Sequence, residues 1–388
     1  MALDNKRGVV LVLLDLSAAF DTVDHTLLLA CMKRIGVIDV AHQWFESYLS
    51  SRTQTVCLGQ TKSDTLELRQ GVPQGSVLGP VLFTLYTGPI GQIIRRHRLD
   101  FHLFADDSQL YVSFKINDTN DETIALARIQ ACVDDLKAWM IHHRLQLNDS
   151  KTEVLVFTTP SSAGKHNLTD VVIGDSILKP TTVARNLGVM FDSAFNMKSQ
   201  VSKLCQAAYY HLHRIRAIRD CLTQHATELL VHALVISRLD YGNSLLYGLP
   251  DLLLDKLQRA QNAAARVVVK ASRYDHVTPI LETLHWLPVR YRIQYKIILT
   301  TYKAIHLLAP SYLSDLLEFY QPIRTLRSSS ESLLVVNRTH LRQFDDRAFC
   351  IAAPHLWNDL PRNMRTCDSL YQFKKLLKTY LFKRAFYS

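Results

Sequence analysis

The alternation of apolar and polar residues predicts a β-hairpin over residues 101–114, FHLFADDSQLYVSF. Leu110, Val112 and Phe114 recur at every second position, as in a half-buried strand, and residues 103–104 supply the strand before it. Asp106 and Asp107 fall at the turn. Two adjacent carboxylates repel each other, and a bound cation would relieve that cost; an acidic hairpin tip without a ligand is the alternative interpretation.

The unbroken apolar run at residues 9–14 predicts a fully buried central strand, which needs neighbours on both sides. The run stops at Asp15, at the end of a strand where open sheets place ligand sites. Capping of the following turn is the alternative role for Asp15. After this run, apolar residues at helical spacing predict a helix. Asp24 is among its candidate N-caps, and Gly36 ends it.

A loop rich in glycine and proline comes next, at residues 68–80, and an apolar helix follows it. Its distinctive residues are Gly71, Pro73, Gln74, Gly75, Ser76, Gly79 and Pro80. Such a loop lets the backbone approach a ligand closely, although a plain connector has the same composition. Before it, residues 56–58 and 66–68 are predicted to pair as strands.

Mixed helical and strand patterns continue to about residue 192 and then give way to helices. Period-2 runs predict strands at 145–147, 154–157 and 186–189, and an amphipathic helix spans 129–140. From Met197 onward the apolar spacing is helical. We therefore expect a first domain at 1–192, a second at 193–271 and a third at 272–388.

Composition favours an ordered protein that binds polyanions. The chain has 388 residues, of which 48% are hydrophobic and 21% charged, and a formal net charge of +10. Nucleic acid is the natural partner, although lysine-covered helices are also ordinary solvated surfaces. The seven cysteines form no CxxC motif, which indicates reduced thiols in an intracellular protein, and no membrane span or leader is expected.

The acidic residues suggest a chemistry if the strand ending at Asp15 lies beside the hairpin. Asp15, Asp106 and Asp107 would then repel strongly unless they held Mg²⁺, which prefers oxygen ligands and is often completed by substrate phosphates. Two such ions about 4 Å apart activate an attacking 3′-hydroxyl and neutralise a departing pyrophosphate. This chemistry is nucleotidyl transfer.

Five segments in this order resemble the successive palm motifs of reverse transcriptases, and most closely those of non-LTR (LINE-like) retrotransposons. They are VLLDLSAAFD, RQGVPQGSVLGPVLF, LFADD, LNDSKTEVLVF and NLGVMFD, which together span about residues 8–192. Later segments, among them SRLDYGNSLLYGLP, resemble the thumb and C-terminal parts of such element-encoded proteins.

The resemblance implies a metal and proton-transfer site. Asp15 and Asp106 would bind two Mg²⁺ ions, or Mn²⁺ as the alternative, with help from the backbone carbonyl of Leu16. Asp107 would support the site and the primer end. Lys151 matches the lysine that protonates the leaving pyrophosphate, while a plain surface lysine is the competing explanation.

The resemblance to reverse transcriptases also implies a nucleotide site. Phe20 matches the steric gate that excludes a ribose 2′-hydroxyl, and an ordinary core residue is its alternative role. The residues expected to line the incoming nucleotide and template base are Pro73, Gln74, Gly75 and Ser76. Leu187 and Gly188 would belong to the primer grip.

The expected fold is therefore α/β (α+β): a palm with an antiparallel sheet, a helical thumb and a basic, mostly helical extension. The expected function is RNA-directed DNA polymerase acting on an RNA template, a DNA primer or hybrid, and deoxynucleotides, in an element ribonucleoprotein of nucleus and cytoplasm. Only fourteen residues precede Asp15, which predicts an N-terminally truncated element copy without fingers, or a partial gene model. A catalytically inactive nucleic-acid-binding remnant is the main alternative, and a palm-fold cyclase or other template-independent nucleotidyl transferase is a third.

Overall fold

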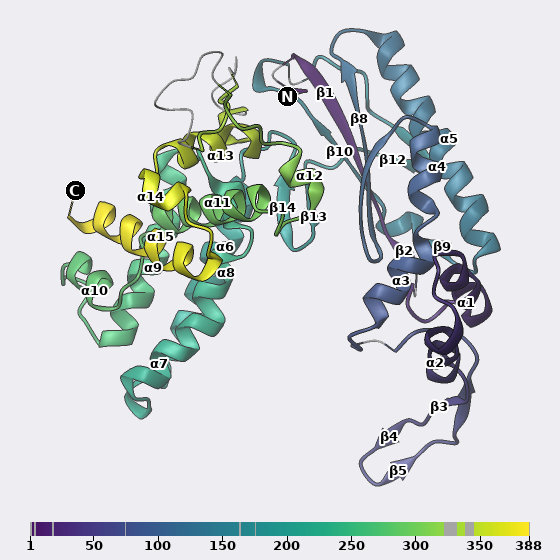
Figure 1. The fold of residues 1–388 in the computed structure, drawn as a ribbon, viewed down its shortest axis with the longest axis horizontal. Coiled ribbons are helices and arrows are strands. Elements are labelled where there is room, and N and C mark those ends of the chain that lie inside the picture. The colour runs from purple at the N-terminus through teal and green to yellow at the C-terminus, as the bar shows by residue number, and fades with distance from the viewer. Residues whose placement is uncertain are drawn as a thin grey trace. The chain divides into compact units, whose positions relative to one another are not determined.

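The computed structural model describes residues 2–3, 5–17, 19–73, 75–162, 164–174, 176–321, 332–337 and 345–387. The chain forms two compact units, Ala2–Gly188 and Val189–Ser388 (Figure 1). Each unit has its own hydrophobic core. Both contain helices, and the paired strands are antiparallel, so the predicted mixed α/β class with antiparallel sheets is confirmed.

The first unit alternates strands and helices. Its elements are β1 (Arg7–Leu14), β2 (Leu16–Ser17), α1 (His25–Arg34), α2 (Asp39–Leu49), β3 (Arg52–Gln54), β4 (Cys57–Leu58), β5 (Thr61–Lys62), β6 (Leu66–Leu68), α3 (Gly79–Thr87), α4 (Ile90–Arg96), β7 (Asp100–Phe104), β8 (Asp107–Lys115), α5 (Thr119–His142), β9 (Gln146–Leu147), η1 (Asp149–Lys151), β10 (Glu153–Phe157), η2 (Pro160–Ser162), β11 (Val171–Ile173), β12 (Ser176–Leu178) and β13 (Val183–Asn186).

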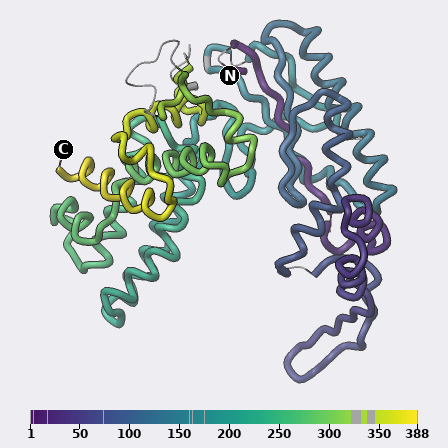
Figure 2. The backbone as a smooth tube through the Cα atoms, viewed as in Figure 1, coloured from purple at the N-terminus to yellow at the C-terminus, as the bar shows by residue number. Residues whose placement is uncertain are grey.

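The main sheet has the strand order β10-β1-β8-β7, so β1 is central as predicted. In Figure 2 this purple segment runs beside strands that come much later in the chain. Val10 pairs with Val112 on one side and Val156 on the other. The prediction that β1 is fully buried is wrong, because only alternate residues are buried: helices such as α5 cover one face of the sheet (Figure 1).

Two local predictions are also wrong. Residues 66–68 pair with Arg52–Gln54 and not with residues 56–58, because a second small hairpin, β4–β5, occupies the tip. Residues 186–189 do not form one strand, since Leu187 and Gly188 have φ angles of 45° and 82°. These positive φ angles turn the chain, so β13 ends before them.

The second unit begins with a strand and is otherwise mostly helical. Its elements are β14 (Val189–Asp192), α6 (Lys198–Ala217), η3 (Arg219–Cys221), α7 (Gln224–Val231), η4 (His232–Ile236), α8 (Ser237–Asp240), η5 (Asn243–Leu246), α9 (Asp251–Val269), α10 (Val277–Thr283), α11 (Val289–Ile305), α12 (Ser311–Ser314), η7 (Asp345–Arg347), α13 (Phe349–Asn358), α14 (Arg362–Arg365) and α15 (Leu370–Phe386).

One hydrophobic cluster runs through this second unit. It includes Leu257 of α9, Ile297 of α11, and Phe373 of α15, whose ring stacks on Tyr302 at 4.1 Å. Residues before and after position 272 therefore share a core. Within the described part of the chain, no helix is both long and apolar enough to cross a membrane.

Candidate active site

The β1–β8 pairing brings three carboxylates to one end of the main sheet. The last pair of this ladder is Leu14 opposite Ser108, so Asp15 and Asp107 are the next residues on the two strands. Asp106 lies in the turn between β7 and β8, where Ala105 has a φ of 52°. The structure thus brings together the three acidic residues that the sequence analysis selected.

The Asp107 carboxyl lies within electrostatic reach of Asp106 and Asp15. Burial raises the pKa of the Asp107 carboxyl above its ordinary value, and the negative charges of Asp106 and Asp15 raise it further. All three causes disfavour the ionised form. A cation placed among these side chains would reverse that effect.

Asp15 is held in position by the segment that follows β9. The backbone N–H of Asn148 donates to the Asp15 carbonyl oxygen at 2.8 Å, and Leu16 pairs with Leu147. Lys151 Nζ lies 3.6 Å from Asp15 Oδ2, which is an ion-pair distance but is too long for a hydrogen bond. Asp15 Oδ2 is buried and has no hydrogen-bond partner among the described residues.

A cavity of about 510 Å³ opens beside these carboxylates, within the first unit. Its lining residues are Asp15, Leu16, Ala19, Phe20, Pro73, Gly75, Ser76, Gly79, Pro80, Asp106 and Lys151. Most of the predicted site residues therefore surround one space, which has the size of a typical ligand pocket. Gln74 lies outside the described residues.

The glycine-rich loop is attached to the chain that follows Asp15. The Val72 N–H donates to the Phe20 carbonyl at 2.8 Å, and the Gly71 N–H donates to the Val23 carbonyl at 2.8 Å. Gly71 has a φ of +90°, and a Cβ atom there would lie 3.0 Å from the Asp21 carbonyl oxygen. Only glycine fits this approach without strain, and the approach places Pro73 and Gly75 beside Phe20.

Ser76 has a structural role in this loop. Its hydroxyl donates to the Pro73 carbonyl at 2.7 Å and accepts the Gly79 N–H at 2.9 Å, which satisfies an amide at the start of α3. The hydroxyl hydrogen is therefore already used. Ser76 contributes mainly to the shape of the cavity.

Phe20 contacts both the core and the cavity. Its ring lies 5.0 Å from the ring of the fully buried Phe83, and it also lines the open space next to Asp15. The two roles weighed for Phe20, a core residue and a gate, are therefore compatible in this geometry.

Leu187 and Gly188 form the turn after β13 and do not line the cavity. The neighbouring Asn186 accepts a 2.8 Å hydrogen bond from the Gln109 side chain, two residues after Asp107 on the same face of β8. This link connects the predicted primer grip to the hairpin that carries Asp106 and Asp107.

Two residues that hold the site were missed by sequence reasoning, Gln109 and His25. A ring nitrogen of His25 is 2.8 Å from the Gly71 carbonyl oxygen and helps to fix the loop. The Gln109–Asn186 pair spans 77 positions of the chain, so no local pattern signals it.

The donor set suits a divalent cation that is completed by its substrate. Among the described residues, no three His, Cys, Asp or Glu side chains already form a ready-made metal site. The Asp15 oxygen that accepts no hydrogen bond and the mutual repulsion at Asp107 nevertheless fit a cation with carboxylate ligands. Mg²⁺ commonly binds in this way, through one or two carboxylates plus phosphate oxygens and water.

Family comparison identifies this unit. Residues 1–191 match the family model described as reverse transcriptase (RNA-dependent DNA polymerase). An α/β unit with an antiparallel sheet and carboxylates beside a nucleotide-sized cavity agrees with that class. Residues 1–191 are a reverse transcriptase domain, and the resemblance seen in the sequence is confirmed.

The more specific type follows from the relatives, which are polymerases of non-LTR retrotransposons. The chain is 26% identical over 302 residues to a probable RNA-directed DNA polymerase from transposon BS of Drosophila melanogaster, covering 73% of this chain and 31% of the relative. It is also 26% identical over 214 residues to the RNA-directed DNA polymerase from the mobile element jockey of Drosophila melanogaster. This match covers 53% of this chain and 22% of the relative. The chain thus spans less than a third of either relative's length.

Among solved structures, the chain is similar to telomerase from Candida albicans in complex with a fragment of telomeric RNA. The identity is 12% and the TM-score 0.32, with 74% of this chain and 47% of that chain covered.

Proposed function

We propose that this chain catalyses RNA-directed DNA synthesis, adding deoxynucleotides to a 3′-hydroxyl along an RNA template. The observation that carries the proposal is the cavity of the first unit, which Asp15, Asp106, Lys151 and Phe20 line together. Its size suits a nucleotide, and its side chains are those that nucleotidyl transfer needs.

The carboxylates of Asp15 and Asp106, with the Leu16 carbonyl, would hold two Mg²⁺ ions, or Mn²⁺ in their place. Bound there, the metal supplies Lewis-acid stabilisation of the triphosphate and of the attacking hydroxyl. Asp107 adds negative charge beside this pair. Lys151, already 3.6 Å from Asp15, donates a proton to the leaving pyrophosphate.

The remaining residues of the cavity orient the nucleotide. Pro73, Gly75 and Ser76 border the space in which the base and sugar lie, and Gln74 belongs to the same loop. Phe20 excludes a 2′-hydroxyl and so favours deoxynucleotides. Leu187 and Gly188 act as the primer grip through the Asn186–Gln109 hydrogen bond.

We assign residues 1–192 as palm, 193–271 as thumb and 272–388 as a basic extension. Helix α6 supports the thumb assignment, because it carries no Asp or Glu and presents exposed Lys203, Tyr209, Tyr210 and Arg214. Arg214 lies over the Tyr210 ring, 5.8 Å from its centroid. Cationic and aromatic side chains of this kind bind the phosphates and bases of an RNA–DNA hybrid. The placement of the protein in a nuclear and cytoplasmic ribonucleoprotein stays a prediction.

The test is primer extension on poly(rA)/oligo(dT) with Mg²⁺. We expect Asp106→Asn to abolish extension while salt-sensitive binding of the hybrid persists, since the carboxylate serves chemistry and not phosphate contacts. Asp100→Asn is the matched control, because Asp100 is exposed on the same hairpin at the far end of β7.

Extension by the native chain and by Asp100→Asn, but not by Asp106→Asn, supports the polymerase. Equal loss of extension and binding in Asp106→Asn overturns the metal-site assignment. If the folded native chain binds the hybrid but extends nothing, the inactive nucleic-acid-binding remnant is the better description. Product made without a template would instead favour a palm-fold cyclase or another template-independent nucleotidyl transferase.

A further inference from the structure

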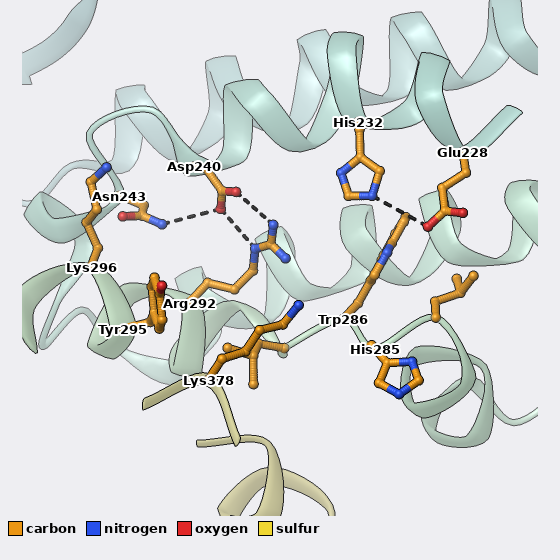
Figure 3. Close-up of a pocket in the computed structure, with 12 residues that line it drawn as sticks. Glu228, His232, Asp240, Asn243, His285, Trp286, Arg292, Tyr295, Lys296 and Lys378 are labelled. Carbon is orange, nitrogen blue, oxygen red and sulfur yellow. Dashed lines mark hydrogen bonds and ion pairs between the residues drawn. The ribbon is translucent and has the colours of Figure 1, made fainter. Parts of the chain in front are cut away.

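A second cavity, of about 500 Å³, lies wholly within the second unit (Figure 3). Its lining residues are Glu228, His232, Asp240, Asn243, Leu284, His285, Trp286, Leu287, Arg292, Tyr295, Lys296 and Lys378. They come from α7, η4, α8, η5, the segment between α10 and α11, α11 itself, and α15. The motif SRLDYGNSLLYGLP contributes Asp240 and Asn243, and the polymerase site uses neither.

Two buried polar atoms of this cavity lack partners. Trp286 is 3% exposed and Asn243 is 4% exposed, yet Trp286 Nε1 and Asn243 Oδ1 have no hydrogen-bond partner in the described part of the chain. Buried polar atoms are nearly always paired. One of these atoms is a donor and the other an acceptor, so a ligand with both kinds of group would satisfy them.

The cavity lining has a small positive excess, with Arg292, Lys296 and Lys378 against the carboxylates of Asp240 and Glu228. Arg292 donates two hydrogen bonds of 2.9 and 2.7 Å to Asp240 through Nε and Nη2, and its Nη1 has no partner among the described residues. Lys296 and Lys378 line the same space and form no ion pair within the described ranges. In Figure 3 the Lys378 ammonium points into the gap between Arg292 and Trp286. A phosphate in this gap would lie between the Lys378 ammonium and the Arg292 guanidinium.

Aromatic rings border the same space. His232 meets Trp286 edge-on, with ring centroids 5.1 Å apart, and its Nε2 lies 3.6 Å from Glu228 Oε1. Tyr295 and His285 line the cavity on either side. Proteins recognise an unstacked nucleotide through aromatic rings, through hydrogen bonds to the base edges and through basic side chains.

We propose that this cavity binds one nucleotide unit, with its phosphate at Lys378 and Arg292 and its base or sugar hydrogen-bonded to Trp286 Nε1 and Asn243 Oδ1. The unit is either a free nucleotide or one nucleotide of an RNA strand. The site is separate from the carboxylates of the first unit and does not depend on their activity.

The test follows the four tryptophan indole N–H resonances of the full chain by NMR. The Trp286 resonance is assigned as the one lost in Trp286→Phe. The probes are AMP, adenosine, inorganic phosphate and a six-nucleotide oligo(rA). We expect AMP to shift the Trp286 resonance saturably, and Lys378→Ala to weaken this binding about tenfold, the size of one charge-assisted hydrogen bond.

Lys374→Ala is the matched control, because Lys374 is exposed on the same helix and does not line the cavity. The affinity of Lys374→Ala for AMP, measured at Trp286, should equal that of the native chain. The affinity of Asp106→Asn should equal it as well, because Asp106 lies in the first unit. Tighter binding of oligo(rA) than of AMP identifies a strand as the ligand, and equal binding identifies the free nucleotide. The proposal is overturned if AMP leaves Trp286 unshifted, if phosphate or adenosine alone binds as well as AMP, or if Lys378→Ala has no effect.

Discussion

At the scale of single residues, Phe20 shows how one side chain can serve both packing and selectivity. Replacing it with valine removes the ring beside Phe83 and enlarges the space next to Asp15. We expect Phe20→Val to incorporate ribonucleotides more readily and to lose about 1–2 kcal/mol of stability, since Phe20 is only partly buried. The measurements are the ratio of dNTP to rNTP incorporation and the free energy of unfolding.

Phe83→Leu separates these two effects, because Phe83 is fully buried beneath Phe20 and does not line the cavity. It should lower stability and keep the sugar selectivity of the native chain. If Phe20→Val and Phe83→Leu both lower stability and neither alters the selectivity, Phe20 is a core residue and not a gate.

Lys151 allows a sharper test, because its side chain is 69% exposed and contributes little to folding. We expect Lys151→Ala to lower kcat on the order of a hundredfold, a typical contribution of a general acid, with KM for the nucleotide nearly unchanged. Lys165→Ala, at an exposed position that does not line the cavity, is the control and should match the native kcat. A rise in KM without a fall in kcat would identify Lys151 as a binding residue.

The sequence revealed these residues because each belongs to a short motif whose chemistry depends on residue type. Asp106 and Asp107 stand out on an apolar hairpin, and Asp15 ends an apolar run. Gln109 and His25 gave no such signal, because their roles depend on partners, Asn186 and Gly71, that only the fold brings near. Site residues that belong to a short motif could therefore be predicted from the sequence. Residues that support the site through partners distant in the chain could not.

At the scale of elements, the loop after β6 depends on Gly71. The backbone there has a φ of +90°, and an added Cβ atom would lie only 3.0 Å from the Asp21 carbonyl oxygen, so alanine is doubly unfavourable. We expect Gly71→Ala to destabilise the chain by at least about 1 kcal/mol and to raise KM for the nucleotide, because Pro73 and Gly75 move with the loop. Thermal unfolding and steady-state extension measure the two effects.

Gly59→Ala is the control for backbone conformation alone. Gly59 also has a positive φ, +61°, but nothing lies within 4 Å of the position that a Cβ atom would take. It should cost stability without changing KM. Equal KM changes in both variants would show that contact with Asp21 does not position the loop.

Elements with a strong burial period were predictable, and weakly buried ones were not. Leu110, Val112 and Phe114 of β8 are all buried, and the predicted hairpin is confirmed. Strands β3 to β6 are short and mostly exposed, so their residues carry no pattern that fixes a partner. Their pairing is decided by the two-residue turn of the small β4–β5 hairpin, at Gly59 and Gln60.

At the scale of the whole molecule, the positive charge is concentrated in the second unit. Residues 189–388 contain 27 Lys and Arg against 15 Asp and Glu, a formal charge of +12, whereas residues 1–188 carry −2. The carboxylates of Asp15, Asp106 and Asp107 thus lie in the acidic part of the chain. Affinity for a polyanion is therefore expected from the second unit and chemistry from the first.

Separate expression of residues 1–188 and 189–388 tests this division, since each unit has its own hydrophobic core. We expect 189–388 to unfold cooperatively and to bind an RNA–DNA hybrid with nearly the salt dependence of the full chain, because the counterions released are set by its lysines and arginines. Residues 1–188 should bind the hybrid at least tenfold more weakly. Equal affinity of the two fragments would show that the site around Asp15, and not the basic helices, holds the nucleic acid.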